Sequence, residues 1–184
     1  WGVLKLGSSG AKIKSDVFIT SPNPLFVGFI ETDLLTTQTV FIESTSGDLV
    51  LQNVGTSAPL NRALEGDNVT FRSATGTLRW PSLHSSYPFR IGDGRLTLEA
   101  DEIDLTTNRT IGGPPRPEPG AITGTGSLVL RPSNAATNIQ LGGTNETAAL
   151  DLTLEDLQTF QGLGPIEFGT WNSVTIGRAE DATG

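Results

Sequence analysis

Three carboxylates stand close together near the middle of the chain: Asp101, Glu102 and Asp104. On a strand, Glu102 and Asp104 would share the outward face, opposite Ile103 and Leu105. Such a pair could ligate Ca²⁺ or flank a sugar ring as two catalytic carboxyl groups. The chain lacks the glycine-aspartate nonapeptide of calcium-binding β-rolls. We therefore favour a solvated strand face, and we predict no metal and no cofactor.

The only histidine, His84, lies in a segment at residues 81–88 that also holds the only tyrosine. No second histidine and no cysteine could share a metal with it, and no Gly-x-Ser-x-Gly elbow is present. We predict an exposed or half-packed side chain and no catalytic residue. An enzyme, a β-helical polysaccharide lyase or hydrolase, would need His84 and the acidic cluster to converge on one groove.

Aromatic residues are the remaining candidates for binding. Trp80, Tyr87 and Trp171 could line a carbohydrate groove, because aromatic faces stack on sugar rings. Trp80 is more simply explained by packing in the core or at a corner. Trp171 could instead stack against a neighbouring unit. A glycan-binding adhesin module is therefore an alternative to a purely structural role.

The elements that would position these residues form degenerate repeats. A β-branched strand at 39–42 leads through four mostly small polar residues to Gly-x-Leu-x-Leu at 47–51, and residues 68–80 repeat this arrangement with Trp80 last. Further versions begin at Gly94 and Gly126. These repeats predict an all-β chain of stacked coils with parallel sheets, in which Leu49, Leu78, Leu96 and Leu128 occupy similar core positions.

Loops and exceptions interrupt the repeats. Segments at 53–67, 81–88 and 111–121 are polar or rich in proline and are predicted to project as irregular loops. The apolar segment 25–30 is predicted to be a strand buried on both faces. One short helical turn is expected after Thr153, its cap, with Asp156 at the third position. Its inward residues are predicted to be Leu154, Leu157 and Phe160.

The last third of the chain carries a family resemblance. The strings are GTGSLVLRP at 124–132, NIQLGG at 138–143, the leucine-rich turn at 152–157 and VTIGRA at 174–179. They resemble repeat units of filamentous-haemagglutinin-like bacterial surface exoproteins, which are built on right-handed parallel β-helices. The resemblance covers residues 124–184 well and the first two thirds only in style. It implies export across a Gram-negative outer membrane, exposure at the cell surface, and a role in adhesion or fibres. It brings no catalytic residues.

Composition agrees with an exported structural protein. The chain has 184 residues, no cysteine, no methionine, and a net charge of -8. An acidic surface repels phosphate backbones and anionic lipids, so nucleic acid is not expected as a partner. No apolar run approaches the roughly 18 residues that span a bilayer, so no membrane insertion is expected. The partners that we expect are neighbouring coils, copies of the same protein, and surface glycans.

The predicted organisation is one continuous β-solenoid. Residues 1–123 form degenerate coils with projecting loops, and residues 124–184 form the family-like unit. Trp1 as first residue, without a recognisable secretion domain or signal segment, predicts a segment of a longer or processed chain. We expect a stalk or fibre module of an extracellular, outer-membrane-associated surface protein, and we expect that it is not an enzyme.

Overall fold

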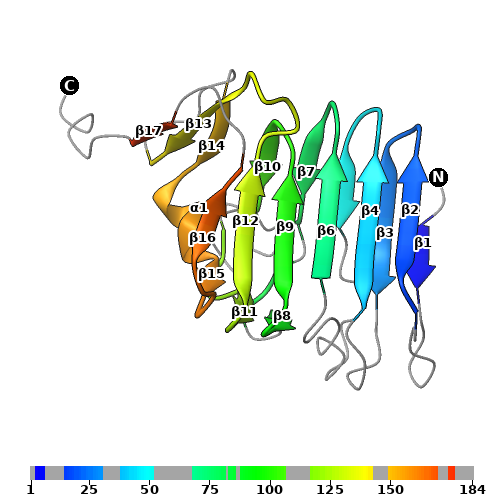
Figure 1. The fold of residues 1–184 in the computed structure, drawn as a ribbon, viewed down its shortest axis with the longest axis horizontal. Helices are drawn as coiled ribbons and strands as arrows, with labels where there is room; N and C mark the ends of the chain where they lie inside the picture. Colours follow the sequence, from blue (N-terminus) through cyan, green and yellow to red (C-terminus); the bar gives the residue numbers. More distant parts are fainter. Residues whose placement is uncertain are drawn as a thin grey trace, which may run out of the picture.

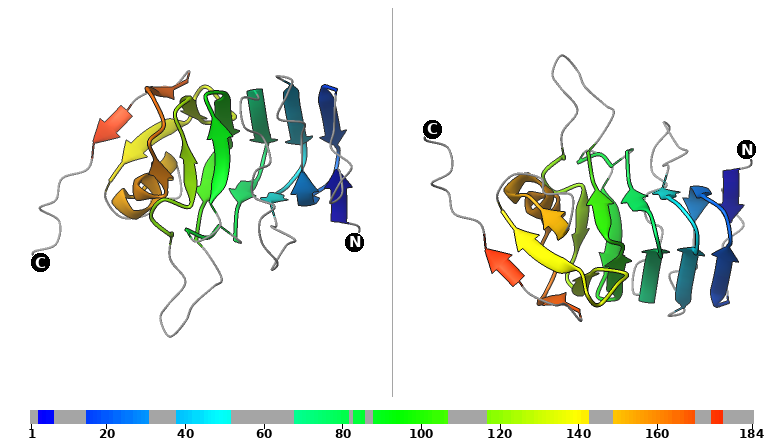
Figure 2. Two further views of the ribbon diagram at one scale, coloured as in Figure 1. Left: turned by 90° about the horizontal axis from the view of Figure 1, so that it is seen from below. Right: turned by 90° about the horizontal axis from the view of Figure 1, so that it is seen from above.

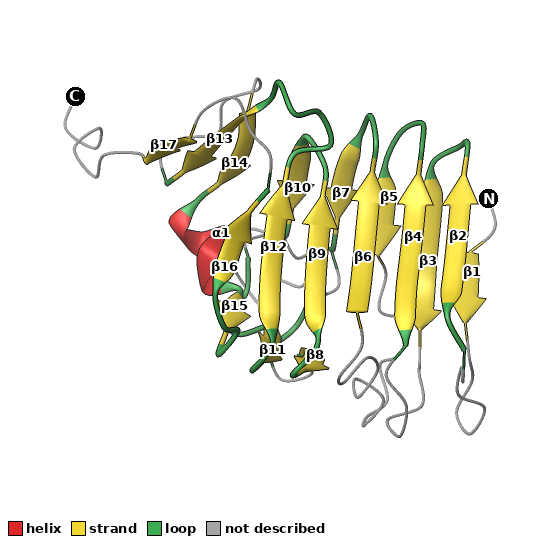
Figure 3. Ribbon diagram, viewed as in Figure 1, coloured by secondary structure: helices red, strands yellow, loops and turns green. Residues whose placement is uncertain are grey.

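The computed structural model describes residues 3–6, 15–30, 38–51, 68–81, 83–85, 88–106, 117–142, 149–169 and 174–176. Within these ranges the chain is all-β with a single short helix, α1 (Leu154–Gln158) (Figure 3). The fold class predicted from the repeats is thus confirmed at the level of an all-β chain. Much of the three predicted loops lies outside the described residues.

Two large sheets carry most of the chain. In spatial order, the six-stranded sheet contains β16 (Ile166–Phe168), β12 (Ser127–Arg131), β9 (Arg95–Glu99), β6 (Asn68–Ser73), β4 (Thr39–Ser44) and β2 (Val17–Ser21). The five-stranded sheet contains β1 (Val3–Leu6), β3 (Leu25–Ile30), β5 (Leu49–Leu51), β7 (Thr77–Arg79) and β10 (Glu102–Asp104). In Figure 1 the six-stranded sheet lies in front of the other, and both run along the long axis.

Two smaller sheets lie toward the C-terminal end. One joins β15 (Phe160–Gln161), β11 (Ile122–Gly124) and β8 (Phe89–Gly92). The other joins β14 (Ala149–Leu152), β13 (Asn138–Leu141) and β17 (Val174–Ile176). Figure 2 shows this last sheet and α1 at the end of the molecule opposite β1 and β2. Every strand pairing among the described residues is parallel, as predicted.

From β1 to β7, consecutive strands alternate between the two large sheets. We call one strand of the six-stranded sheet and the following strand of the five-stranded sheet a pass: β2 with β3, β4 with β5, β6 with β7, and β9 with β10. Residues in register on successive passes are 23, 29 and 27 positions apart along the chain, and the step from β9 to β12 is 32. The irregular spacing fits a constant stack joined by loops of variable length. The β9–β12 pairing joins the two predicted segments.

Alternation along each strand builds the core. Val40, Val69, Leu96 and Leu128 are in register and each is at most 1% exposed. A second inward column two residues further along holds, in register, Ile42, Phe71, Leu98 and Leu130. Side chains between these columns point away from the core, because successive residues of a strand face opposite sides. Neighbouring parallel strands therefore place apolar side chains of similar kind in contact within each inward column.

Glycines at the corners permit close approach of successive passes. A Cβ at Gly126 would lie 1.8 Å from the carbonyl oxygen of Gly94, and one at Gly76 would lie 2.5 Å from the carbonyl carbon of Gly47. Backbone atoms cannot yield to such a contact, so a side chain at Gly76 or Gly126 would push the strands apart. This close stacking is the physical reason that glycine opens the repeats.

Two sequence predictions about packing need correction. The four leucines are all buried, but Leu49 and Leu78 pair within the five-stranded sheet, whereas Leu96 and Leu128 pair within the six-stranded sheet. The Gly-x-Leu motif therefore occurs at two kinds of corner, one that leads into the five-stranded sheet and one that leads into the six-stranded sheet. Leu25 and Phe26 are only half-buried, so the described part of the 25–30 strand is not buried on both faces. The register of β3 with β1 begins only at Phe26, so Leu25 at the start of the strand has a register partner on β5 alone.

The predicted helix and its cap are confirmed, with one change. Thr153 accepts a hydrogen bond from the backbone of Asp156, whose carboxylate accepts one from the backbone of Thr153. This reciprocal pair is a capping box. Leu157 and Phe160 pack on the core, but Leu154 is 66% exposed and does not face inward. At the first position of a five-residue helix, Leu154 lies on the face opposite buried Asp156.

No helix in the described part of the chain has the length and apolar character needed to cross a bilayer.

Candidate functional site

An acidic pocket lies where β7 and β10 meet β14 and α1. Its volume is about 230 Å³. The polar residues that line it are Thr77, Arg79, Glu102, Asp104, Thr106, Asp151 and Asp156. Four of these side chains are carboxylates from three elements, and one is a cation. We call this feature the acidic pocket.

Strand alternation places the first two carboxylates. Ile103 is 2% exposed and Leu105 is fully buried, so both point into the core. Glu102 and Asp104 therefore share the outward face, as predicted. Asp101 is not part of the pocket: its carboxylate accepts hydrogen bonds from the backbone of Asn134 and the hydroxyl of Thr137, at 3.0 and 3.2 Å. The three carboxylates that are close in sequence are thus separated: Asp101 bonds Asn134 and Thr137, whereas Glu102 and Asp104 line the acidic pocket.

Arg79 supplies the only positive charge among the pocket-lining residues. Its Nη1 donates to Oδ2 of Asp104 at 2.8 Å, and its Nε donates to Oδ2 of Asp48 at 3.1 Å. The hydrogen bond from Arg79 to Asp48 is the main reason that the pKa of Arg79 is raised. Asp104 also accepts a hydrogen bond from the backbone of Thr106 at 3.0 Å. One carboxylate of the pocket is therefore paired with a cation.

Among the described residues, Glu102 forms no ion pair of its own with a cation. Burial, and then the neighbouring charges of Asp151, Asp104 and Asp156, raise the pKa of Glu102 to about 7. Arg79 opposes this shift but does not cancel it. Burial also raises the pKa of Asp156, against the hydrogen bonds from Thr153, which lower it. Near neutral pH the pocket therefore contains a carboxyl group that can give or take a proton, beside one that is ion-paired.

The carboxylates do not converge as metal ligands. Within the residues that the structure describes, no three acidic or histidine side chains are arranged to hold a metal ion. The chemistry that the pocket could perform is proton transfer, or electrostatic binding of a positively charged group.

His84 is placed away from this pocket. Its side chain is 23% exposed, and Nδ1 lies 3.6 Å from Oε2 of Glu118. The same carboxylate oxygen accepts the backbone N–H of Ser85 at 2.7 Å. His84 is thus half-packed, as predicted, and the structure does not bring it together with the acidic cluster.

The aromatic candidates divide in a similar way. Trp80 is 3% exposed and meets Phe71 and Phe89 edge-on, with ring centroids 5.6 and 4.8 Å apart. The structure therefore places Trp80 in the core, where its faces cannot stack on a sugar ring. Tyr87 and Trp171 lie outside the described residues, so their proposed role in binding stays a prediction.

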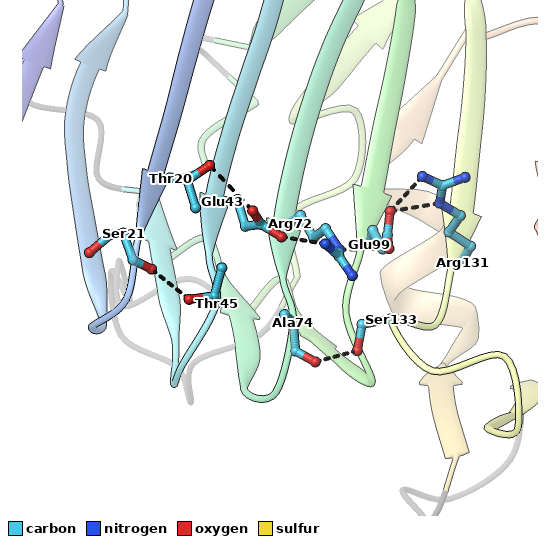
Figure 4. Close-up of polar contacts among 9 residues, drawn as sticks. All are labelled: Thr20, Ser21, Glu43, Thr45, Arg72, Ala74, Glu99, Arg131 and Ser133. Carbon is cyan, nitrogen blue, oxygen red and sulfur yellow. Dashed lines mark hydrogen bonds and ion pairs between the residues drawn. The ribbon is translucent and has the colours of Figure 1, made fainter.

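A polar ladder crosses the outer face of the six-stranded sheet (Figure 4). Its members are Thr20, Glu43, Arg72, Glu99 and Arg131, one from each of five adjacent strands. Arg72 bonds Glu43 through Nη1 and Glu99 through Nε, the latter at 2.8 Å. Arg131 donates to Oε2 of Glu99 from Nε at 2.8 Å and from Nη2 at 2.6 Å.

The ladder buries its acidic members. Glu43 and Glu99 are each 7% exposed, whereas the Arg131 side chain is 44% exposed. A charge so far removed from water is tolerated only where it is paired. Thr20 donates to Glu43 at 3.3 Å at one end of the ladder. These contacts hold successive passes in one register.

Sequence analysis missed three charged residues of the pocket: Arg79, Asp151 and Asp156. Asp151 sits between buried Leu150 and Leu152, so alternation alone would have placed it outward. Arg79 follows Leu78 in the same way. Asp156 was assigned only to the cap of α1. No local signal shows that these three residues meet Glu102, because β10 and β14 are distant in sequence.

Comparison with known proteins adds no relative: no protein-family model matches the sequence, and neither the curated proteins nor the solved structures yield a match.

Proposed function

We propose that the chain is a structural and adhesive module of a large extracellular bacterial surface protein, and that its passes are coils of a right-handed parallel β-helix. The observation that carries this proposal is the strand order. From the first pass to the fourth, each pass pairs in parallel with the next one in both large sheets. Such stacking produces a rod whose length grows with the number of coils.

The energetics of the stack support a shaft. Inward columns such as that of Ile42 and Phe71 run from pass to pass and stay at most 1% exposed. Each pass therefore depends on its neighbours for cover, as in other linear repeat proteins. Neighbouring coils or copies of the same protein are the partners that fit such an arrangement, and the resemblance over residues 124–184 suggests the bacterial cell surface.

Antibody labelling of the source cells tests this proposal. Antibodies raised against the folded chain should label intact cells, and protease added outside should remove the labelling. Labelling that appears only after the cells are permeabilised would contradict a surface role.

One observation favours a second candidate function, a β-helical polysaccharide-degrading enzyme. The acidic pocket combines Glu102, with a pKa of about 7, and Asp104, which is paired with Arg79. Two carboxyl groups in such different environments suit an acid and a base. Release of reducing ends from acidic or neutral polysaccharides, lost in Asp104→Ala and retained in Asp93→Asn at an exposed turn, would support this candidate. If the parent chain does not cleave any of these polysaccharides, this second candidate function is wrong.

A further inference from the structure

Two sets of ion-paired outward side chains, one on each large sheet, alternate in sign from pass to pass. Arg95 on β9, which pairs with Glu167 of β16, lies outside these sets. In order, the acidic second pass holds Glu43 and Asp48, the basic third pass Arg72 and Arg79, the acidic fourth pass Glu99 and Asp104, and β12 then brings Arg131. The same alternation thus appears on both large sheets. On the five-stranded sheet, Arg79 bridges the passes on either side of it, through Asp48 and Asp104.

The aromatic contacts of Phe71 with Trp80 and Phe89 mark only the third pass, and the aliphatic core does not distinguish the other passes. Along one inward column the residues are Val40, Val69, Leu96 and Leu128, and such aliphatic side chains could pack on one another in almost any order. A strand could therefore skip a neighbour, or slip by two residues, and still point its apolar side chains inward. Some other feature must select the correct neighbour.

We infer that the alternating charges of the polar ladder select the neighbour of each strand in the six-stranded sheet and fix its register. Skipping one pass would bring Glu43 beside Glu99, or Arg72 beside Arg131, and like charges directly opposite each other destabilise a sheet. A slip of β6 by two residues would place Ala74 opposite Glu43, which is 7% exposed and would lose its ion pair. Both errors leave a buried charge unpaired, so only the native strand order gives every charged residue of the ladder an oppositely charged partner.

The experiment reports the register with a pair of engineered cysteines. Thr70 and Thr97 are register partners on the outer face, and Phe41 lies one strand further along the same row. Neighbouring strands are about 4.8 Å apart, within reach of a disulfide, whereas strands two steps apart exceed its limit of about 7 Å. The chain has no cysteine of its own. The pairs are therefore Thr70→Cys with Thr97→Cys, and Phe41→Cys with Thr97→Cys.

Each pair is placed in three versions of the ladder and refolded from denaturant in a glutathione buffer. The first version is the parent ladder. The second is neutral, with Glu43, Arg72, Glu99 and Arg131 all changed to Gln. The third exchanges the signs, with Glu43→Arg, Arg72→Glu, Glu99→Arg and Arg131→Glu. Disulfide yields are measured by mass spectrometry after proteolysis.

The parent and the exchanged ladder are expected to close the 70–97 pair alike and to leave the 41–97 pair open. The neutral ladder should lose at least about threefold in 70–97 yield and gain the 41–97 product. A neutral ladder that closes 70–97 as completely as the parent overturns the inference. If the neutral ladder does not fold, the exchanged ladder decides: native pairing supports the inference, and unfolded or scrambled product overturns it.

Discussion

At the scale of single residues, Glu102 illustrates how burial couples a charge to stability. Its pKa is raised from 4.5 to about 7 in the folded chain. The folded state therefore keeps this proton at pH values where the unfolded chain has released it. By linkage, stability falls as pH rises from about 4.5 to about 7, and changes no further above that range on account of this group.

Glu102→Gln should remove this loss of folding stability at higher pH. The variant is expected to be more stable than the parent at pH 8 by about 1 kcal/mol, and equally stable at pH 4. The full shift would correspond to roughly 3 kcal/mol, but Glu102 is half-exposed and solvent screens the interaction. The measurement is urea unfolding at several pH values.

Asp93→Asn is the matched control for this prediction, because it removes one carboxylate from an exposed turn. It should not reproduce the gain in stability of Glu102→Gln at pH 8. A Glu102→Gln variant whose advantage does not grow with pH would contradict the assigned pKa.

Residue-scale prediction from sequence succeeded where only alternation was needed. It placed Glu102 and Asp104 outward and Ile103 inward, because neighbouring residues of a strand face opposite sides. It could not find Asp151 or Arg79 beside them, since their meeting depends on how β7, β10 and β14 come together in space. A contact between strands that are distant in the sequence cannot be predicted from the local pattern of either strand.

At the scale of elements, the capping box decides the stability of α1. A five-residue helix has too few internal hydrogen bonds to be stable alone, so its cap and packing must hold it. Thr153→Ala is expected to lower the free energy of unfolding by about 1 kcal/mol, measured by denaturant titration. Gln158→Ala, at the exposed end of the same helix, should change it little. Equal effects of the two changes would exclude a special role for the cap.

The two faces of the six-stranded sheet should differ sharply in their tolerance of substitution. Phe71 on β6 is 1% exposed, whereas Phe18 on β2 is 69% exposed. Phe71→Ala should cost about 3–5 kcal/mol, because it opens a cavity among Trp80 and Phe89. Phe18→Ala, the same chemical change at the surface, should stay within about 0.5 kcal/mol. Similar losses in thermal unfolding would contradict the assigned inward face.

Strands were predictable as elements, but their assignment to sheets was not. Gly-x-Leu marks the start of β5 and β7 in one sheet and of β9 and β12 in the other. Glycine is needed at both kinds of corner, since successive passes approach closely at each. The local sequence therefore identifies a corner without identifying which sheet follows it. For the same reason the four leucines looked equivalent and proved to belong to two columns.

At the scale of the whole molecule, stability is shared along the stack. Val40 and Ile42 are fully buried between two neighbouring passes, whereas their register partners Val17 and Ile19 on the outer strand β2 remain half-exposed. This difference in exposed fraction shows how much burial one further neighbouring strand adds. Parallel sheets of this kind gain cover by adding strands at their edges, which suits a module that continues into others.

Electron microscopy of the native protein that contains this chain tests the central proposal most directly. Stacked coils predict a thin rod with an axial repeat of about 4.8 Å, the spacing between neighbouring strands. Antibodies against this chain should decorate the rod along its shaft. Compact particles without that repeat would contradict the account of the chain as a coil-stacked shaft.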